Sequence, residues 1–178
     1  MLPKINLYKK ESKLTKPSLK LKDSYIESIK EFHQEGRYID LSIDYLENNF
    51  EMFLSEICNE EKGVGLKDGY VPATVLWLEN EDGFIGRVSI RHSLTKELLN
   101  RGGHIGYDIR PSLRNRGYGS EILKLVLPIA KGLGIEKILI TCADNNIGSC
   151  KIIEKNGGIL ENKIKENEVV VRRYWINQ

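Results

Sequence analysis

The chain has 178 residues, of which 40% are hydrophobic and 29% are charged, values usual for a soluble globular protein. Its 27 Lys and Arg nearly balance 25 Asp and Glu, which argues against the dominant basic surface of a nucleic-acid-binding protein. We find neither the stretch of about 18 apolar residues that spans a bilayer nor the apolar run of a signal peptide. We therefore expect a single cytoplasmic domain, residues 1–178, that binds neither nucleic acid nor membrane.

The three cysteines, Cys58, Cys142 and Cys150, show no CxxC spacing. An odd number without paired spacing predicts neither a disulfide framework nor a metal site. We expect each cysteine to be a small buried apolar side chain rather than a nucleophile.

The first half of the chain predicts a short strand followed by two helices. Ile5–Tyr8 is the candidate strand. Apolar residues at helical spacing predict helices over Asp23–Glu35 and about Asp44–Glu61. The acidic residues of 23–61, eleven against Lys30 and Arg37, fall on the outer faces of these helices.

After residue 61 the pattern of apolar residues changes from one typical of helices to one typical of strands. Ala73–Leu78 and Phe84–Ile90 are rich in β-forming residues, and Glu81-Asp82-Gly83 between them is a turn signal, so the pair predicts a hairpin. A further strand, His104–Ile109, follows two glycines and ends before a proline.

The second half alternates helix and strand. A helix is predicted over Gly117–Leu133, with a kink or early end at Pro128, which removes a backbone donor. The apolar run Ile135–Cys142 predicts a buried strand, Ile147–Lys155 a short helix, and Ile159–Ile176 two further strands. The fold class is therefore α/β (α+β): one domain with a mixed, mostly antiparallel central sheet flanked by helices.

A basic, glycine-containing loop, Arg114-Asn115-Arg116-Gly117-Tyr118-Gly119, leads from a predicted strand into a predicted helix. The start of a helix exposes unpaired N–H groups and the positive end of the helix dipole. Glycine lets the backbone approach a ligand closely, and arginine suits phosphate oxygens. The loop is a candidate pyrophosphate site, although plain connectors share its composition.

The run from His104 to Gly119 resembles the signature of the GNAT superfamily of N-acetyltransferases, in which a strand leads into an Arg/Gln-x-x-Gly-x-Gly/Ala loop. Asn146 to Ser149, followed by Ile153 to Gly157, resembles the next block of that family. The resemblance implies the GNAT fold and acetyl-CoA as co-substrate, with no metal.

The resemblance also implies roles for matching residues. Backbone amides of Arg116 to Gly119 would hold the pyrophosphate, backbone groups of Tyr107 and Ile109 would pair with the pantetheine arm, and Asn146 would bond that arm from the opposite side. Arg114 or Lys151 would meet the 3′-phosphate. The implied cofactor-binding residues are Tyr107, Ile109, Arg114, Asn115, Arg116, Gly117, Tyr118, Gly119 and Asn146.

Two residues are candidates for catalysis. His104 starts a strand where many family members carry a glutamate, and an imidazole titrates near neutrality, so it is a candidate base; a histidine bonded within the sheet is the alternative. Ser149 is a candidate contact to the thiol, or a residue bonded to its own backbone. Ile153 stands where many members have a tyrosine acid, and Tyr174 is a second, distant candidate for that role.

The acceptor is left open by two conflicting hints. The acidic segment 23–61 would attract a cationic amine, whereas Arg87, Arg91 and Arg101 would bind a carboxylate. The function predicted is transfer of an acetyl group to a primary amine of a small molecule, or of a peptide or protein N-terminus. A non-catalytic coenzyme A-binding module and a protein-interaction domain are the alternatives, and a homodimer is one option for the assembly.

Overall fold

The computed structural model describes residues 10–177, so the strand predicted at Ile5–Tyr8 lies outside the described residues. The helices and strands are, in chain order, β1 (Lys13–Thr15), α1 (Lys22–Gln34), α2 (Ile43–Glu61), β2 (Ala73–Asn80), β3 (Gly83–Arg91), α3 (Lys96–Asn100), β4 (Ile105–Ile109), α4 (Tyr118–Gly132), β5 (Lys137–Ala143), α5 (Ile147–Lys155), β6 (Ile159–Glu166) and β7 (Val169–Asn177). The predicted fold class is confirmed. The expectation that each cysteine is buried holds for Cys142 and Cys150 and is wrong for Cys58, which is exposed.

The strands form two sheets, with orders β1-β2-β3-β4 and β5-β7-β6, and each pair of neighbours is antiparallel. The sheets meet where β4 begins, through a bridge between Gly103 and Ile140. There the His104 N–H donates to the Leu139 carbonyl at 2.7 Å. Beyond this point β4 and β5 diverge, which opens one edge of β4.

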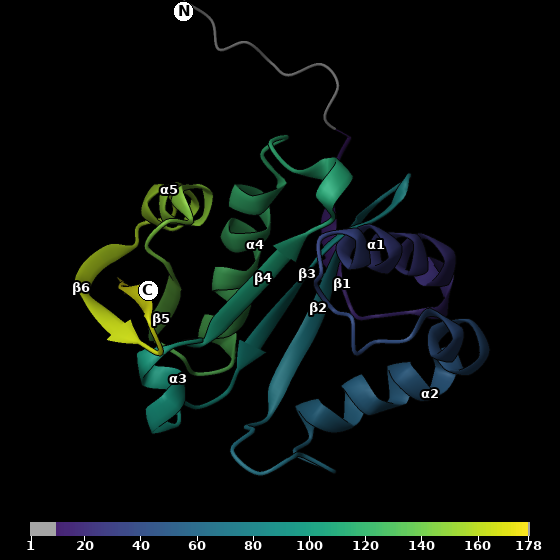
Figure 1. Ribbon diagram of the computed structural model, residues 1–178, viewed down its shortest axis with the longest axis horizontal. Coiled ribbons are helices and arrows are strands. Elements are labelled where there is room, and N and C mark those ends of the chain that lie inside the picture. The colour runs from purple at the N-terminus through teal and green to yellow at the C-terminus, as the bar shows by residue number, and fades with distance from the viewer. Residues whose placement is uncertain (1–9, 178) are drawn as a thin grey trace, which may run out of the picture.

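Different side chains fill the two sides of the first sheet. Helices α1 and α2 cover one face with an aromatic cluster, in which Tyr25 stacks on Trp77 at 4.4 Å between ring centroids (Figure 1). On the other side α4 and α5 pack on an aliphatic core that includes Ile122 and Val126. The sheet is thus buried on both faces.

Of the two outcomes predicted at Pro128, a kink or an early helix end, the early end is wrong. Helix α4 continues past Pro128 to Gly132. Pro128 and Lys124, whose carbonyl loses its usual donor, both lie on the exposed face, where water can satisfy that carbonyl. The buried face, with Val126 and Ala130, holds the helix on the core across this point.

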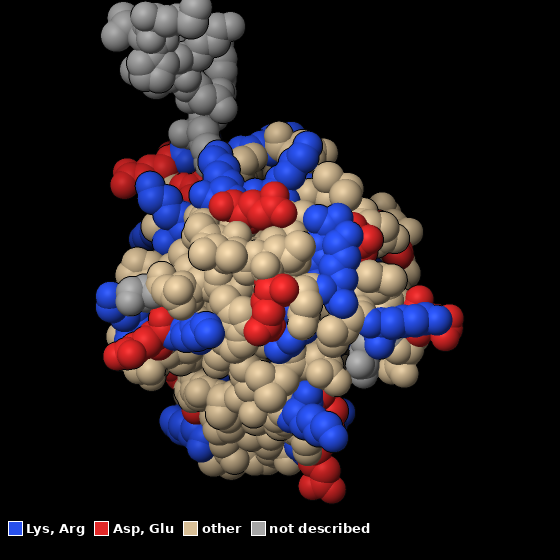
Figure 2. Space-filling view, turned by 90° about the vertical axis from the view of Figure 1, so that its left-hand side faces the viewer, with Lys and Arg blue, Asp and Glu red and all other residues tan. Residues whose placement is uncertain are grey.

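The surface carries mixed charge. On the face that contains α5 and β6, Lys and Arg alternate with Asp and Glu without forming an expanse of one sign (Figure 2). Within residues 10–177, no helix combines the length and hydropathy that a membrane span requires.

Candidate active site

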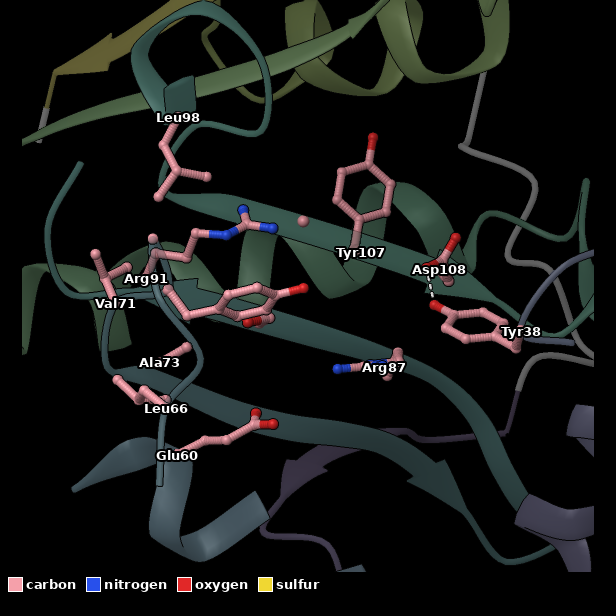
Figure 3. Close-up of a pocket in the computed structure, with 14 residues that line it drawn as sticks. Tyr38, Glu60, Leu66, Val71, Ala73, Arg87, Arg91, Leu98, Tyr107 and Asp108 are labelled. Carbon is pink, nitrogen blue, oxygen red and sulfur yellow. Dashed lines mark hydrogen bonds between the residues drawn. The ribbon is translucent and has the colours of Figure 1, made fainter. Parts of the chain in front are cut away.

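Two cavities meet at β4. The larger, about 560 Å³, opens between β3, β4 and the segment that follows α2, and the smaller, about 290 Å³, lies between β4 and β5. They share three lining residues, Arg91, Gly106 and Tyr107. Figure 3 shows the larger cavity, with Tyr107 on its upper side.

The edge of β4 that faces the smaller cavity presents backbone groups of Tyr107 and Ile109, the two residues predicted to pair with the pantetheine arm. The His104 carbonyl accepts from Arg91 and the Arg110 N–H donates to Ile85, both across the β3 side. Because bonding alternates along an antiparallel strand, the N–H and C=O groups of Tyr107 and Ile109 point to the β5 side. Among the described strands, that side is paired only at Gly103. The Ile109 carbonyl also accepts from Arg114 Nε at 3.2 Å.

His104 lies where the two sheets join. Its Nδ1 accepts the Leu139 N–H at 3.0 Å, so in the neutral ring the proton is on Nε2. Burial and the nearby Arg91 lower the pKa of His104. Its side chain is absent from the linings of both cavities. The lone pair that a base would use is therefore engaged in holding β5 against β4.

The predicted phosphate loop has the conformation of an anion cradle. Asn115 and Gly117 adopt positive φ angles of 61° and 84° on either side of Arg116. Left-handed residues within a turn gather successive N–H groups into a concavity, and here Gly117 is also the N-cap of α4. The loop and the start of α4 therefore suit the phosphates of a nucleotide.

The two other glycine-loop residues have structural roles that the sequence did not show. A Cβ on Gly119 would lie 2.6 Å from Ile152 Cδ1, so glycine lets α4 pack closely on α5. Tyr118 is buried in the aliphatic core.

Arg114 is already paired. Its guanidinium binds the Glu35 carboxylate through two hydrogen bonds of 2.7 and 2.8 Å. Arg116, by contrast, lines a cavity of about 180 Å³ with Lys10 and Arg110. Of the two arginines, Arg116 is the better placed to meet a phosphate.

Asn146 and Ser149 line the smaller cavity at the start of α5. Asn146 Oδ1 accepts the Ser149 N–H at 3.0 Å and so caps the helix. Ser149 Oγ lies 3.0 Å from Tyr107 Oη. Burial raises the pKa of Tyr107 to about 12, with the Ser149 hydrogen bond opposing that rise.

The Tyr107–Ser149 pair was missed by sequence reasoning, which gave Tyr107 a backbone role alone. The two residues are 42 positions apart, and no local pattern links them. Ile153 is buried in the core, and Tyr174 donates to Glu154 at 2.9 Å, away from both cavities. The pair thus places two hydroxyl groups where the cavities meet.

The acidic segment does not converge on the larger cavity. Glu31 binds Arg110 at 2.7 Å, and Glu35 binds Arg114. Of the acidic residues in 23–61, Glu60 lines the cavity. Arg87 and Arg91 line it from β3, whereas Arg101 lines the smaller cavity.

Comparison with known proteins agrees with this geometry. A family model described as "Acetyltransferase (GNAT) domain" matches residues 28–159, which is most of the chain. The search of curated proteins gave no match.

Solved structures share the fold at low identity. The microcin C7 self-immunity acetyltransferase MccE, solved with acetyl-CoA and AMP, is 15% identical with a TM-score of 0.68, over 94% of this chain and 93% of that one. The Salmonella typhimurium enzyme that modifies the N-terminal serine of ribosomal protein L7/L12 is 15% identical with a TM-score of 0.66, over 94% and 95%. The acyltransferase class expected from the sequence is confirmed by the family match, and the chain belongs to the GNAT acetyltransferase family.

Proposed function

We propose that this protein transfers an acetyl group from acetyl-CoA directly to a primary amine. The observation that carries the proposal is the meeting of two cavities at Gly106 and Tyr107. A donor in the smaller cavity and an amine in the larger one would face each other there. Holding two reactants in line supplies several kcal/mol, on the order of 7–11 in the best cases.

The donor side is supported by backbone geometry. At Tyr107 and Ile109 the edge of β4 offers backbone groups that could hydrogen-bond the amides of a pantetheine arm, which would lie along β4 like an added strand. Asn146 lies across the cavity from this edge. The positive-φ loop at Asn115 and Gly117 offers amides to the pyrophosphate. The structurally similar MccE was solved with acetyl-CoA, which supports the same donor here.

In the reaction, the amine nitrogen forms a bond to the acetyl carbon and the carbon–sulfur bond breaks. One proton leaves the amine to solvent and one is taken up by the coenzyme A thiolate. An alkylamine with a pKa of about 10.4 is unprotonated in about one molecule in 2,500 at pH 7, a cost of about 4.6 kcal/mol. Lowering this cost is the main task of the acceptor site.

We assign the proton donor to the Tyr107–Ser149 pair. The pKa of Tyr107, about 12, keeps the phenol protonated at neutral pH, and its hydroxyl lies 3.0 Å from Ser149 Oγ. Ser149, a candidate contact to the thiol from the sequence, would in this proposal act on the thiolate together with Tyr107. We do not assign the base to His104, because its Nδ1 lone pair accepts the Leu139 N–H.

A thermal-shift titration followed by a transfer assay tests the proposal. Acetyl-CoA at about 100 times its Kd should stabilise the protein by about 2.7 kcal/mol. Thiol release is then measured with polyamines, amino acids, amino-acid amides and peptides as acceptors. A shift without thiol release would favour the non-catalytic module, and no shift would contradict coenzyme A binding. The homodimer and the cytoplasmic location stay predictions.

A further inference from the structure

Two arginines point into the larger cavity from one face of β3. Arg87 and Arg91 are four residues apart with Ser89 between them, so their side chains lie on the same side of the sheet. Figure 3 shows the guanidinium groups directed toward the middle of the cavity from opposite ends. Such a pair can converge on one small ligand.

Within the described residues, neither arginine has an ion-pair partner in contact with it, but neighbouring acidic groups act on Arg87 at a distance. Burial lowers the pKa of Arg87, and the nearby Tyr38, Asp108 and Glu60 more than offset this, so the pKa is raised. No ion pair joins Arg87 or Arg91 to a carboxylate within residues 10–177. Arg91 Nη1 donates instead to the carbonyls of Gly102 and Gly103, at 3.2 and 3.0 Å. Arg87 lies 5.9 Å from the Tyr38 ring centroid.

The nearest acid of β4 is already engaged. Asp108 also lines the cavity, but its carboxylate binds Arg37 and accepts a hydrogen bond from the hydroxyl of Tyr38. Figure 3 shows the Tyr38 bond at the right-hand end of the cavity. Asp108 is thus paired with Arg37 and acts on Arg87 through its charge alone, without a hydrogen bond that would turn the Arg87 guanidinium away from the cavity.

Two like charges in a partly enclosed site repel each other. Burial lowers the pKa of Arg91, and the charge of Arg87 lowers it further. A guanidinium nevertheless stays charged at neutral pH. An oxyanion between the two groups would relieve the repulsion and accept paired hydrogen bonds from either fork.

The cavity also has an acidic side. Glu60, at the end of α2, points into it opposite the β3 arginines (Figure 3). A ligand with both an anionic group and an amine would therefore find a charge of the opposite sign for each group. Of the acidic segment that the sequence offered as an attraction for a cationic amine, Glu60 lines the cavity, whereas Glu31 and Glu35 pair with Arg110 and Arg114.

The arginines lie close to the place of transfer. Ser89 pairs with Gly106 across the β3–β4 ladder, and neighbouring strands are about 4.8 Å apart. An oxyanion above Ser89 would thus be one strand spacing from Gly106, where the two cavities meet. The amine and the oxyanion must then be close neighbours in the acceptor molecule.

We propose that the acceptor is an amino-acid-like small molecule whose oxyanion, a carboxylate or a phosphate, is bound by Arg87 and Arg91 while its amine reaches Gly106 and Tyr107. This inference rests on the proposed function and names its substrate class. A cavity of about 560 Å³ has the size of an ordinary small-molecule site.

Matched acceptor pairs test this proposal. Each common amino acid is compared with its amide, and aminoethyl phosphate with ethanolamine, by the rate of thiol release from acetyl-CoA. The wild-type kcat/KM should be about 10- to 100-fold higher for the anionic member of the preferred pair, because hydrogen bonds to a charged group contribute a factor of that size. The better of the carboxylate and phosphate pairs identifies the oxyanion.

The variant Arg87→Gln should remove that preference. We expect kcat/KM to fall about 10- to 100-fold for the anionic acceptor and less than about threefold for its neutral partner, with the Kd of acetyl-CoA unchanged. The control is Lys62→Gln, which also removes one positive charge. Lys62 is exposed and directly follows α2, so this variant should retain the preference for the anionic acceptor. If Arg87→Gln fails to fold, Arg87→Lys keeps the charge and should lose part of the preference.

Equal or better rates with the neutral acceptors would overturn the inference, as would an equal loss for both acceptors in Arg87→Gln. Transfer to neutral amines alone would leave the proposed function standing. No thiol release with any acceptor would overturn both, and the thermal shift with acetyl-CoA would then show whether donor binding survives.

Discussion

The two cavities on either side of β4 differ in what lines them. The smaller one is bounded by the free edge of β4, the start of α5 and small residues such as Ala143 and Gly102, together with polar side chains such as Asn146. In the proposed function, backbone groups would therefore do much of the recognition there. The larger one is lined by Tyr38, Glu60, Arg87 and other side chains that differ in charge and size. Backbone recognition depends on the fold, whereas side-chain recognition can vary from one protein to another. The donor therefore follows from the family, and the acceptor must be inferred from this chain.

The largest effect is expected from a charge placed on the donor side. Gly117→Glu should weaken acetyl-CoA binding by about 1,000-fold, because a carboxylate in the phosphate cradle repels the ligand by several kcal/mol. Isothermal titration measures the Kd. Gly134→Glu is the control, since Gly134 has the same φ of 84° at the other end of α4 and open space around its Cβ. Equal affinities for the two variants would disprove the loop as the donor site.

A change at the junction should affect turnover rather than binding. Tyr107→Phe removes the proposed proton donor and should lower kcat by about 100-fold, with the KM of acetyl-CoA changed little. Ser149→Ala should have a similar effect, and the double variant should be little worse than either single one, because the two hydroxyls act together. Additive losses would mean that the pair does not act as a unit.

His104 should matter for stability, with little effect on chemistry. His104→Ala leaves the Leu139 N–H without its partner and should destabilise the protein by about 1–3 kcal/mol, as measured by urea unfolding. His104→Asn can restore an acceptor and should recover part of the loss. A kcat lowered about 100-fold in both variants would return His104 to the role of base.

The pH dependence of stability gives a second test of His104. Its pKa is lowered in the folded state, so the unfolded chain binds the proton more tightly. Its contribution is fully present above the unfolded pKa of about 6.5 and is lost as the pH falls toward the lower, folded pKa. In His104→Asn, unfolding free energy measured between pH 5 and 8 should fall less on acidification than in the wild type.

The smallest effect is expected at Arg114. Because Glu35 already binds its guanidinium, Arg114→Gln should change the KM of acetyl-CoA less than about threefold and cost about 1 kcal/mol or less in stability. Arg116→Gln should raise that KM more. The reverse order would place the phosphates on Arg114.

The sequence predicted the long, periodic elements and the order of the fold, because helix faces and alternating strands are local patterns. Three-residue β1 and five-residue α3 are too short to carry a period, and neither was predicted. Continuation of α4 through Pro128 depends on tertiary packing that overrides the local cost of proline.

For the candidate site, the sequence could indicate the loop and strand that carry backbone groups, but it could not indicate contacts between distant partners. The loop Arg114 to Gly119 lies between β4 and α4, as the motif predicted, and its Gly117 adopts a left-handed conformation that the sequence analysis did not specify. The pairing of Arg114 with Glu35 spans 79 residues and that of Tyr107 with Ser149 spans 42. Only the folded chain brings such pairs together.

The assignment of the donor to the smaller cavity and the acceptor to the larger one is tested most directly by amide hydrogen exchange with and without acetyl-CoA. We predict slower exchange at Tyr107 and over residues 116–119, with exchange over residues 64–73 around the larger cavity unchanged. Protection of residues 64–73 with none at Tyr107 or in the loop would contradict the assignment of donor and acceptor to their cavities.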